Sequence, residues 1–284
     1  MKIITLNTHS LIEKQYEEKL QEFVKVIQAE EPDVFALQEV NQTAEEICYP
    51  YNKLKGFTPC TDCDTVIRID NHAARLAELL AEKGLFYYWT WIPIKLGYDK
   101  YDEGMALFSK LEIIETHQFY TSKVQDYNNW KTRKALGIKT LDAGGCWFYC
   151  IHMGWWDDKD EPFQSQWDVI EKTIAEKKGH VWLLGDFNSP AHISGEGYDY
   201  IRNHGWKDSY ISAKEKDSGI TVGNVIDGWR DSTVDEAGMR IDIIWSKEEE
   251  AVKTSDVICN GKNHPIVSDH YGVMITVECE EKYE

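Results

Sequence analysis

The sequence has no excess of basic residues and no apolar run long enough to span a membrane. Of its 284 residues, 31 are Lys or Arg and 49 are Asp or Glu, which gives a formal net charge of −18. Because an acidic protein repels polyanions and anionic membranes, long DNA or RNA and a membrane surface are both disfavoured as partners. A bound metal ion can still reverse the field locally, so this argument concerns the surface as a whole and not the site.

The seven Cys do not form the pattern of a disulfide framework. Their number is odd and they are scattered through a long chain, which is typical of reduced thiols. The N-terminal residues lack a basic region followed by an apolar stretch and a small-residue cleavage site, so no signal peptide is expected. We therefore expect a soluble, cytoplasmic protein. Four of the Cys lie in apolar runs and are expected to be small buried hydrophobes: Cys146, Cys150, Cys259 and Cys279.

Residues 43–68 carry several turn-forming residues and predict a long loop. The loop contains Cys48, Cys60 and Cys63, which together with His72 offer the alternative of a zinc site. Their spacing departs from that of common structural zinc sites, so we favour free thiols.

Apolar periodicity predicts alternating strands and helices along the whole chain. Residues 2–6 and 33–40 predict two buried strands around a helix that begins near Tyr16 and ends before Pro32, which together make a βαβ unit. Further helices are expected at 73–80, 163–174 and 198–201, and further strands at 86–92, 104–109, 112–120, 134–141, 146–152, 181–184, 241–245, 256–260 and 271–277. Several of these strands follow one another through short turns, which is typical of antiparallel hairpins. Since no repeat or linker interrupts the pattern, residues 1–284 are predicted to form one domain with a mixed sheet, or two packed sheets, covered by helices.

Polar side chains recur at the ends of the apolar strand runs. A carboxylate in such a run is costly to bury unless it is paired or bound to a metal ion. Because strand ends of an α/β sheet meet at one crevice, we expect these side chains to converge there. The residues are Asn7, Glu39, His152, Asp186, Asn188, Asp242, Asp269 and His270.

The chemical types in this set favour a hard cation. Carboxylate and amide oxygens without a quartet of Cys and His suit Mg²⁺ or Mn²⁺ better than zinc. Two His and a separate Asp add acid–base capacity near neutral pH. A metal, a His and a carboxylate are what phosphoester hydrolysis needs, because the phosphate charge must be neutralised and a water activated.

Seven short segments also carry a resemblance to a known family, and they occur in the family's order. On these segments the sequence resembles the endonuclease/exonuclease/phosphatase superfamily, which includes DNase I-like nucleases, sphingomyelinases and inositol-phosphate phosphatases. The resemblance implies an α/β (α+β) fold, a DNase I-like four-layer sandwich of two mixed β-sheets flanked by helices. The segments are Thr5–Asn7, Leu37–Val40, Glu103–Ser109, Ile151–Gly154, Gly185–Asn188, Arg240–Asp242 and Ser268–His270.

The resemblance implies a role for each polar residue at the metal and the water. Glu39 and Asn7, joined by Asp269, are implied to hold the metal ion. Asp186 is implied to orient or deprotonate the attacking water. Asn188 is implied to hydrogen-bond the phosphate oxygens.

The two His residues are implied to act on the phosphate. His270 would contact the phosphate and be oriented by Asp242. His152 would stabilise charge on the phosphate or the leaving group, held by Glu103. Every ligand type of the family is present, which argues against a non-catalytic relative.

A second set of segments resembles a bacterial branch of the superfamily whose characterised activity is maltose 6′-phosphate phosphatase. This resemblance implies that the small substrate is a sugar phosphate. Trp155 and Trp156 follow His152 closely and would lie at the rim of the metal site, where indole faces suit a sugar ring. Arg133, or Lys131, could bind phosphate. The segments are Asn129–Lys134, His152–Trp156, Glu161–Phe163, Gly195–Tyr200, Lys216–Val222 and Asn260–Lys262.

Structural explanations and rival functions remain open at this point. Asp186 and Asn188 could form a simple turn after a strand, and Asp242 could pair with Arg240 or Arg230 instead of His270. A nuclease with the same metal chemistry is the first rival function, but it needs a basic groove that the net charge disfavours. A phosphodiesterase of lipid head groups needs a membrane-facing loop. A non-catalytic binding module would have lost ligands.

Overall fold

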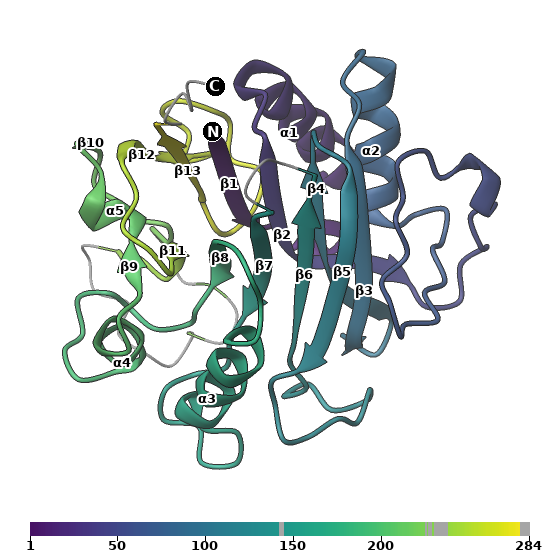
Figure 1. The fold of residues 1–284 in the computed structure, drawn as a ribbon. Coiled ribbons are helices and arrows are strands. Elements are labelled where there is room, and N and C mark those ends of the chain that lie inside the picture. The colour runs from purple at the N-terminus through teal and green to yellow at the C-terminus, as the bar shows by residue number, and fades with distance from the viewer. Residues whose placement is uncertain (142–144, 225, 227–228, 230–237, 279–284) are drawn as a thin grey trace.

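The computed structural model describes the chain from residue 1 to 278, apart from residues 142–144, 225, 227–228 and 230–237. Two β-sheets form its centre (Figure 1). The first sheet has the order β10-β12-β13-β1-β2-β4-β3, with β1 (Lys2–Asn7), β2 (Val34–Thr43), β3 (Tyr88–Gly97), β4 (Tyr101–Ser109), β10 (Glu215–Lys216), β12 (Val252–Ile258) and β13 (Gly272–Val277). The second has the order β5-β6-β7-β8-β11-β9, with β5 (Ile113–Tyr120), β6 (Lys134–Thr140), β7 (Trp147–His152), β8 (Val181–Asp186), β9 (Lys207–Asp208) and β11 (Asp242–Ser246).

Both sheets are mixed. In the first, β1 and β2 are parallel and are joined by α1 (Tyr16–Glu30), which confirms the predicted βαβ unit. In the second, β7 and β8 are parallel and are joined through α3 (Phe163–Ile174). The pairs β3–β4, β5–β6 and β6–β7 are antiparallel neighbours in sequence, as expected for hairpins.

Three apolar layers separate four layers of secondary structure, so the predicted four-layer sandwich is confirmed. One layer lies between the first sheet and the helices α1 and α2 (His72–Glu82), a second between the two sheets, and a third between the second sheet and α3 with α4 (Gly197–Asn203). Successive residues of one strand point into different apolar layers. Leu107 of β4 faces the other sheet, whereas Phe108 stacks on Phe35 beneath the helices, with 4.4 Å between ring centroids. Because these strands are covered on both faces, they read as continuous apolar runs.

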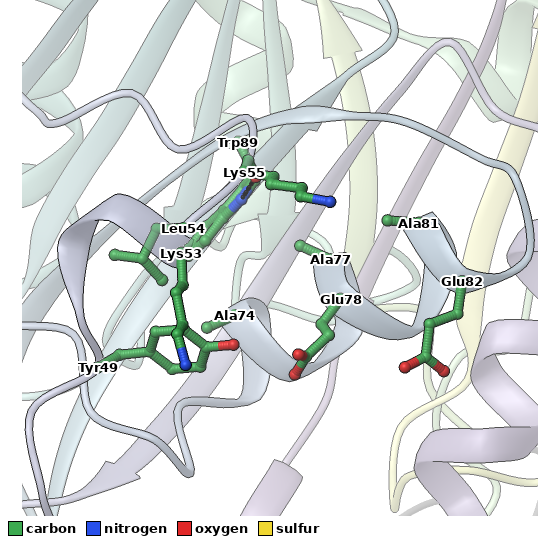
Figure 2. Close-up of a pocket in the computed structure, with 10 residues that line it drawn as sticks. All are labelled: Tyr49, Lys53, Leu54, Lys55, Ala74, Ala77, Glu78, Ala81, Glu82 and Trp89. Carbon is green, nitrogen blue, oxygen red and sulfur yellow. Dashed lines mark hydrogen bonds between the residues drawn. The ribbon is translucent and has the colours of Figure 1, made fainter.

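The predicted loop at 43–68 is irregular apart from a short 3₁₀ helix, Tyr51–Lys53. It packs on α2, and the two frame a cavity of about 300 Å³ (Figure 2). The Trp89 indole lies in its wall and donates from Nε1 to the carbonyl of Lys55 at 3.0 Å. The cavity is also lined by Tyr49, Leu54, Ala74, Ala77 and Glu78.

The thiols of this region are free, and the zinc alternative is not supported. Cys48 is exposed, Cys60 is buried between the sheets, and His72 is hydrogen-bonded to the hydroxyl of Tyr16. Neither of the two potential metal-ligand groups found among the described residues includes them. Of the Cys expected to be buried, Cys150 and Cys259 are buried, Cys146 is half-buried, and Cys279 lies outside the described residues.

Within the described ranges, no helix combines the length and the apolar character needed to cross a bilayer.

The burial of His72 makes the stability of the fold depend on pH. Burial, with a smaller contribution from the Arg75 charge, lowers the pKa of His72 from 6.5 to about 3, and its Nε2 has no hydrogen-bond partner in the described part of the chain. Below pH 6.5 the His72 side chain therefore binds a proton in the unfolded chain, whereas in the folded chain it stays neutral down to about pH 3. The free energy of unfolding is unaffected by this group above pH 6.5 and falls as the pH drops below it, by about 2 kcal/mol at pH 5.

We expect His72→Gln to flatten this part of the pH profile. Urea unfolding of both proteins at pH 7 and pH 5 measures it, and the stability gap between wild type and variant should shrink at the lower pH. Parallel profiles would show that His72 is protonated in the folded state.

Candidate active site

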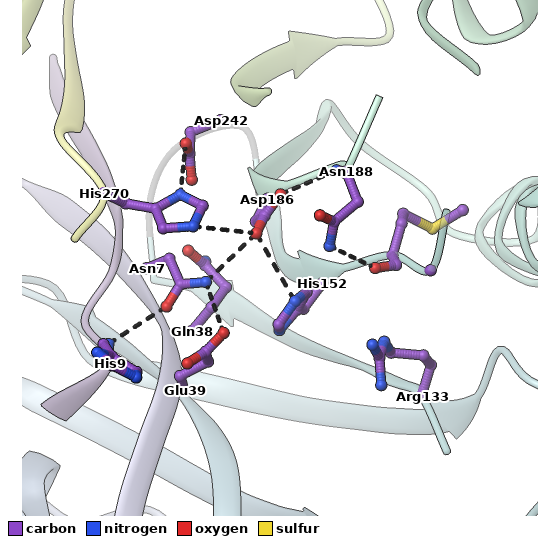
Figure 3. Close-up of polar contacts among 12 residues, drawn as sticks. Asn7, His9, Gln38, Glu39, Arg133, His152, Asp186, Asn188, Asp242 and His270 are labelled. Atoms are coloured by element: carbon purple, nitrogen blue, oxygen red, sulfur yellow. Dashed lines mark hydrogen bonds and ion pairs between the residues drawn. The ribbon is translucent and has the colours of Figure 1, made fainter. Parts of the chain in front are cut away.

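Polar residues at the ends of four strands meet at one edge of the sandwich (Figure 3). Asn7 ends β1, His152 ends β7, Asp186 ends β8 and Asp242 begins β11. The side chain of Asn7 donates from Nδ2 to Glu39 Oε1 at 2.9 Å and to Asp186 Oδ2 at 3.3 Å. One amide thus joins a carboxylate of the first sheet to a carboxylate of the second.

A bulge in β2 aims Glu39 at this centre. The register of β2 against β4 shifts between Leu37 and Val40, and Glu39 has a φ of 53°, a left-handed conformation that costs a non-glycine residue. The carbonyl of Glu39 accepts a hydrogen bond from Ser10 Oγ at 2.8 Å, which holds the bulge. Gln38, one residue earlier, instead enters the space between the sheets and donates to Cys150 Sγ at 3.0 Å.

Asp186 and Asn188 form a turn after β8 that lies inside the site. The backbone N–H of Asn188 donates to Asp186 Oδ1 at 2.8 Å, so the structural turn and the predicted site occur together. Asn188 Nδ2 donates to the carbonyl of Met153 at 3.0 Å, and its Oδ1 accepts from Trp229 Nε1 at 3.0 Å. The amide is therefore held firmly in the protein, with one N–H of its NH₂ group left to face a ligand.

His270 is paired with Asp242, as the sequence predicted. Its Nδ1 lies 3.0 Å from Asp242 Oδ2, and its Nε2 lies 3.8 Å from Asp186 Oδ2. Burial alone would lower the pKa of His270, but the Asp242 and Asp186 carboxylates outweigh it and raise the pKa to about 10. Arg240 pairs with Asp208 at 2.8 Å and not with Asp242; Arg230 lies outside the described residues.

His152 has the opposite electrostatic character. Burial, together with the charges of Arg133 and Lys95, holds its pKa well below 6.5, so the ring is neutral. Its Nε2 lies 3.7 Å from Asp186 Oδ2. The expected support of His152 by Glu103 is wrong: Glu103 forms an ion pair with Lys95 at 3.0 Å, because a buried lysine on the neighbouring strand takes the carboxylate.

The carboxylates of the site are crowded and buried. Burial, followed by the Asp242 charge, raises the pKa of Asp186 to about 7. Burial also raises the pKa of Glu39, and the charges of Glu103 and Asp269 add to it. A divalent cation would relieve this repulsion and favour the ionised forms.

The oxygen donors of Asn7, Glu39 and Asp269 fit such a cation, because amide and carboxylate oxygens are the ligands of hard ions. His9, for which the sequence favoured a place in a solvated loop, lies beside them. Its N–H donates to Asn7 Oδ1 at 3.3 Å, and its ring bonds Glu13 at 2.8 Å and lies 3.9 Å from Asp269. Two compact groups of potential ligands occur among the described residues: His9, Glu13 and Asp269 form one, and Asp186, Asp242 and His270, where His270 already bonds Asp242, form the other.

Of the three residues expected to bind substrate, Arg133 and Trp155 lie together in the structure and Trp156 lies apart from them. Arg133 is buried, with 3% exposure, and its guanidinium points toward His152 (Figure 3). Trp155 lies beside it, with 5.9 Å from the guanidinium carbon to the ring centroid. Trp156 does not reach the site, because it packs against Phe163 and Tyr200 over the outer face of the second sheet.

Lys131 is occupied by two carboxylates and is not available for phosphate. Its Nζ lies 2.8 Å from Asp158 and 2.7 Å from Asp160. Sequence reasoning did not identify Lys95 as a residue near the site. Its position within the apolar run of 89–96 could have done so, because a lysine in such a run indicates a buried, paired charge.

Gly185 allows the close approach that places Asp186 beside β7. It has a φ of 155°, and a Cβ there would lie 1.8 Å from the carbonyl oxygen of Ile151. We expect Gly185→Ala to reduce the free energy of unfolding by more than about 2 kcal/mol, since both strain and overlap must be relieved.

Gly205→Ala is the matched control, because Gly205 has a φ of 91° and nothing within 4 Å of the added Cβ. It should lose only about 1 kcal/mol, the cost of the left-handed conformation alone. Denaturant unfolding of both variants measures the difference, and equal losses would show that the strands move apart at little cost.

Comparisons with known proteins agree with this geometry. The chain matches the endonuclease/exonuclease/phosphatase family over residues 4–270. A structure of a family protein from Leptotrichia buccalis is 32% identical, with a TM-score of 0.84, covering 98% of this chain and 100% of that one. No match was found among curated proteins.

Two more distant structures share the fold. One is a mannosyl-6-phosphatase of Bacteroides thetaiotaomicron, with 17% identity, a TM-score of 0.66, and coverage of 98% of this chain and 100% of that chain. The other is a 3′ phosphatase from Neisseria bound to a product DNA hairpin, with 17% identity, a TM-score of 0.61, and the same coverage. With a family match over residues 4–270 and a relative that is 32% identical across 98% of this chain, the chain belongs to the endonuclease/exonuclease/phosphatase family.

Proposed function

We propose that this protein is a Mg²⁺- or Mn²⁺-dependent phosphatase that hydrolyses the monoester of a phosphorylated sugar such as maltose 6′-phosphate. The family contains phosphatases and nucleases and generally uses divalent metals. The observation that carries the proposal is the convergence of Asp186, the His270–Asp242 pair and the Asn7–Glu39 pair in one buried cluster.

Each part of the cluster suits one requirement of phosphoester hydrolysis. Asn7 and Glu39, with Asp269, would hold the metal ion, which supplies positive charge for the phosphate oxygens. Asp186 takes the proton of the attacking water, whose oxygen bonds to phosphorus as the bond to the sugar oxygen breaks. His270, fixed by Asp242, hydrogen-bonds a phosphate oxygen through Nε2.

The remaining polar residues bind the ester. Asn188 offers its second amide N–H to the phosphate. His152 donates one N–H toward the departing sugar oxygen, which takes its proton from the solvent. Arg133 is the buried cation nearest to these groups and balances the charge of the bound phosphate (Figure 3).

A small sugar phosphate is favoured over a polynucleotide by the charge. The chain carries −18 overall, and Asp158 lines the same hollow as Arg133, where Lys131 joins it to Asp160. These carboxylates repel the further phosphates of a nucleic acid but not a neutral sugar. The distant likeness to the Bacteroides mannosyl-6-phosphatase is in keeping with this choice. The alternative is a nuclease or another phosphodiesterase, in keeping with the distant likeness to the DNA-bound Neisseria 3′ phosphatase.

Release of inorganic phosphate tests the proposal. With Mg²⁺ present, purified protein should release phosphate from maltose 6′-phosphate and leave plasmid DNA intact. Asp186→Asn should lower kcat by about a thousandfold, because the base is lost and the shape is kept. Asp64→Asn, an exposed change of the same kind, should have no effect. Nicked DNA without phosphate release would replace the phosphatase by the nuclease.

Removal of the metal ion tests the ligand assignment. EDTA should abolish phosphate release, and Mg²⁺ or Mn²⁺ should restore it. Glu39→Gln should raise the Mg²⁺ concentration at half-maximal activity by about tenfold or more, whereas Glu249→Gln, at a side chain that is 88% exposed, should not. An unchanged Mg²⁺ requirement in Glu39→Gln would move the metal ion to other ligands.

A further inference from the structure

Trp130 is a large apolar side chain that stands exposed at the edge of the site. Its exposure is 55%, in a protein where six other Trp side chains are among the largest fully buried groups. Trp130 lines the same shallow hollow as Arg133 and Trp155. The exposed indole thus offers an apolar face to a ligand at this edge of the site.

The backbone of Trp130 is tied to the cations of the site. Its carbonyl accepts hydrogen bonds from Arg133 Nη1 at 2.8 Å and from Lys95 Nζ at 3.1 Å. Lys95 is in turn paired with Glu103 at 3.0 Å. The position of the indole is therefore coupled to the buried charges beside His152 and does not depend on a freely moving loop.

Trp155 approaches the same hollow from the end of β7. The Trp130 and Trp155 ring centroids are 5.8 Å apart, and the ring planes are inclined at 57°. The Arg133 guanidinium lies 5.9 Å from the Trp155 centroid, and Lys131 Nζ lies 5.3 Å from the Trp130 centroid. The two indoles thus form an apolar corner beside Arg133, with charged groups along its edge.

We propose that Trp130 and Trp155 form a platform for the sugar ring of the leaving group, an inference that rests on the proposed function. A hexose presents apolar C–H faces that pack on indoles and hydroxyls that need polar partners. Asp158 and Asp160, held by Lys131, supply those partners at the rim. The inclined indoles present two apolar faces to the C–H groups of a puckered sugar ring.

Substrate selectivity tests whether the Trp130–Trp155 platform binds the sugar ring. The ratio of kcat/KM for maltose 6′-phosphate to that for glycerol 3-phosphate, which has no ring, should fall about tenfold in Trp130→Ala. The fall should come mainly from KM, and Trp130→Phe should keep most of the ratio. Tyr51→Ala, which removes a 64% exposed aromatic side chain from the 43–68 loop, should leave both activities unchanged. Equal losses on the two substrates in Trp130→Ala, or no loss, would overturn the platform.

Binding separates this inference from the proposed function. Maltose 6′-phosphate should bind Asp186→Asn, measured by calorimetry with Mg²⁺, about tenfold more tightly than it binds the double variant that also carries Trp130→Ala. If wild type releases no phosphate but this difference remains, the proposed function fails and the platform stands. If wild type is active but the two variants bind equally, or neither binds, the platform fails.

Discussion

The amide of Asn7 is the interaction on which the site depends, because it joins the two sheets at their polar edge. Its Nδ2 bonds a carboxylate of each sheet, Glu39 and Asp186. Elsewhere the sheets meet mainly through an apolar layer, which is non-directional and could tolerate small slides. Hydrogen bonds to carboxylates are directional and stronger, so the amide sets the relative position of the Glu39 and Asp186 carboxylates.

Two strained backbone positions also help to position the Glu39 and Asp186 carboxylates. Glu39 sits in a left-handed bulge, and Gly185 permits a contact that no side chain could make. Each departs from regular strand geometry where a strand carries one of the site's carboxylates, Glu39 or Asp186. Such strain persists because the packed layers on both sides of the strands over-determine it.

The two histidines of the site, His270 and His152, have pKa values shifted in opposite directions. His270 faces carboxylates and carries charge, whereas His152 faces Arg133 and Lys95 and stays neutral. Environments that push the pKa values of two like groups apart are the usual means of giving them different tasks. The same buried cations hydrogen-bond the Trp130 carbonyl, so the position of this exposed indole is linked to the buried charge of the site.

The four-layer sandwich was implied by the resemblance to the family, since the apolar pattern left one mixed sheet or two packed sheets open. The sequence by itself determined the βαβ unit and the strand ends that carry the polar residues. These features are local, because an apolar run interrupted by Asp186 or Glu39 is costly in any fold that does not give the carboxylate a partner. It also indicated the pairing of His270 with Asp242. The tertiary structure alone decided which neighbour each side chain meets across strands and loops. It paired Glu103 with Lys95, packed the half-buried Trp156 against the core beneath α3, and placed Trp130 and His9 beside the site. Those contacts depend on register, a bulge and a loop path, which are set by packing between residues far apart in the chain.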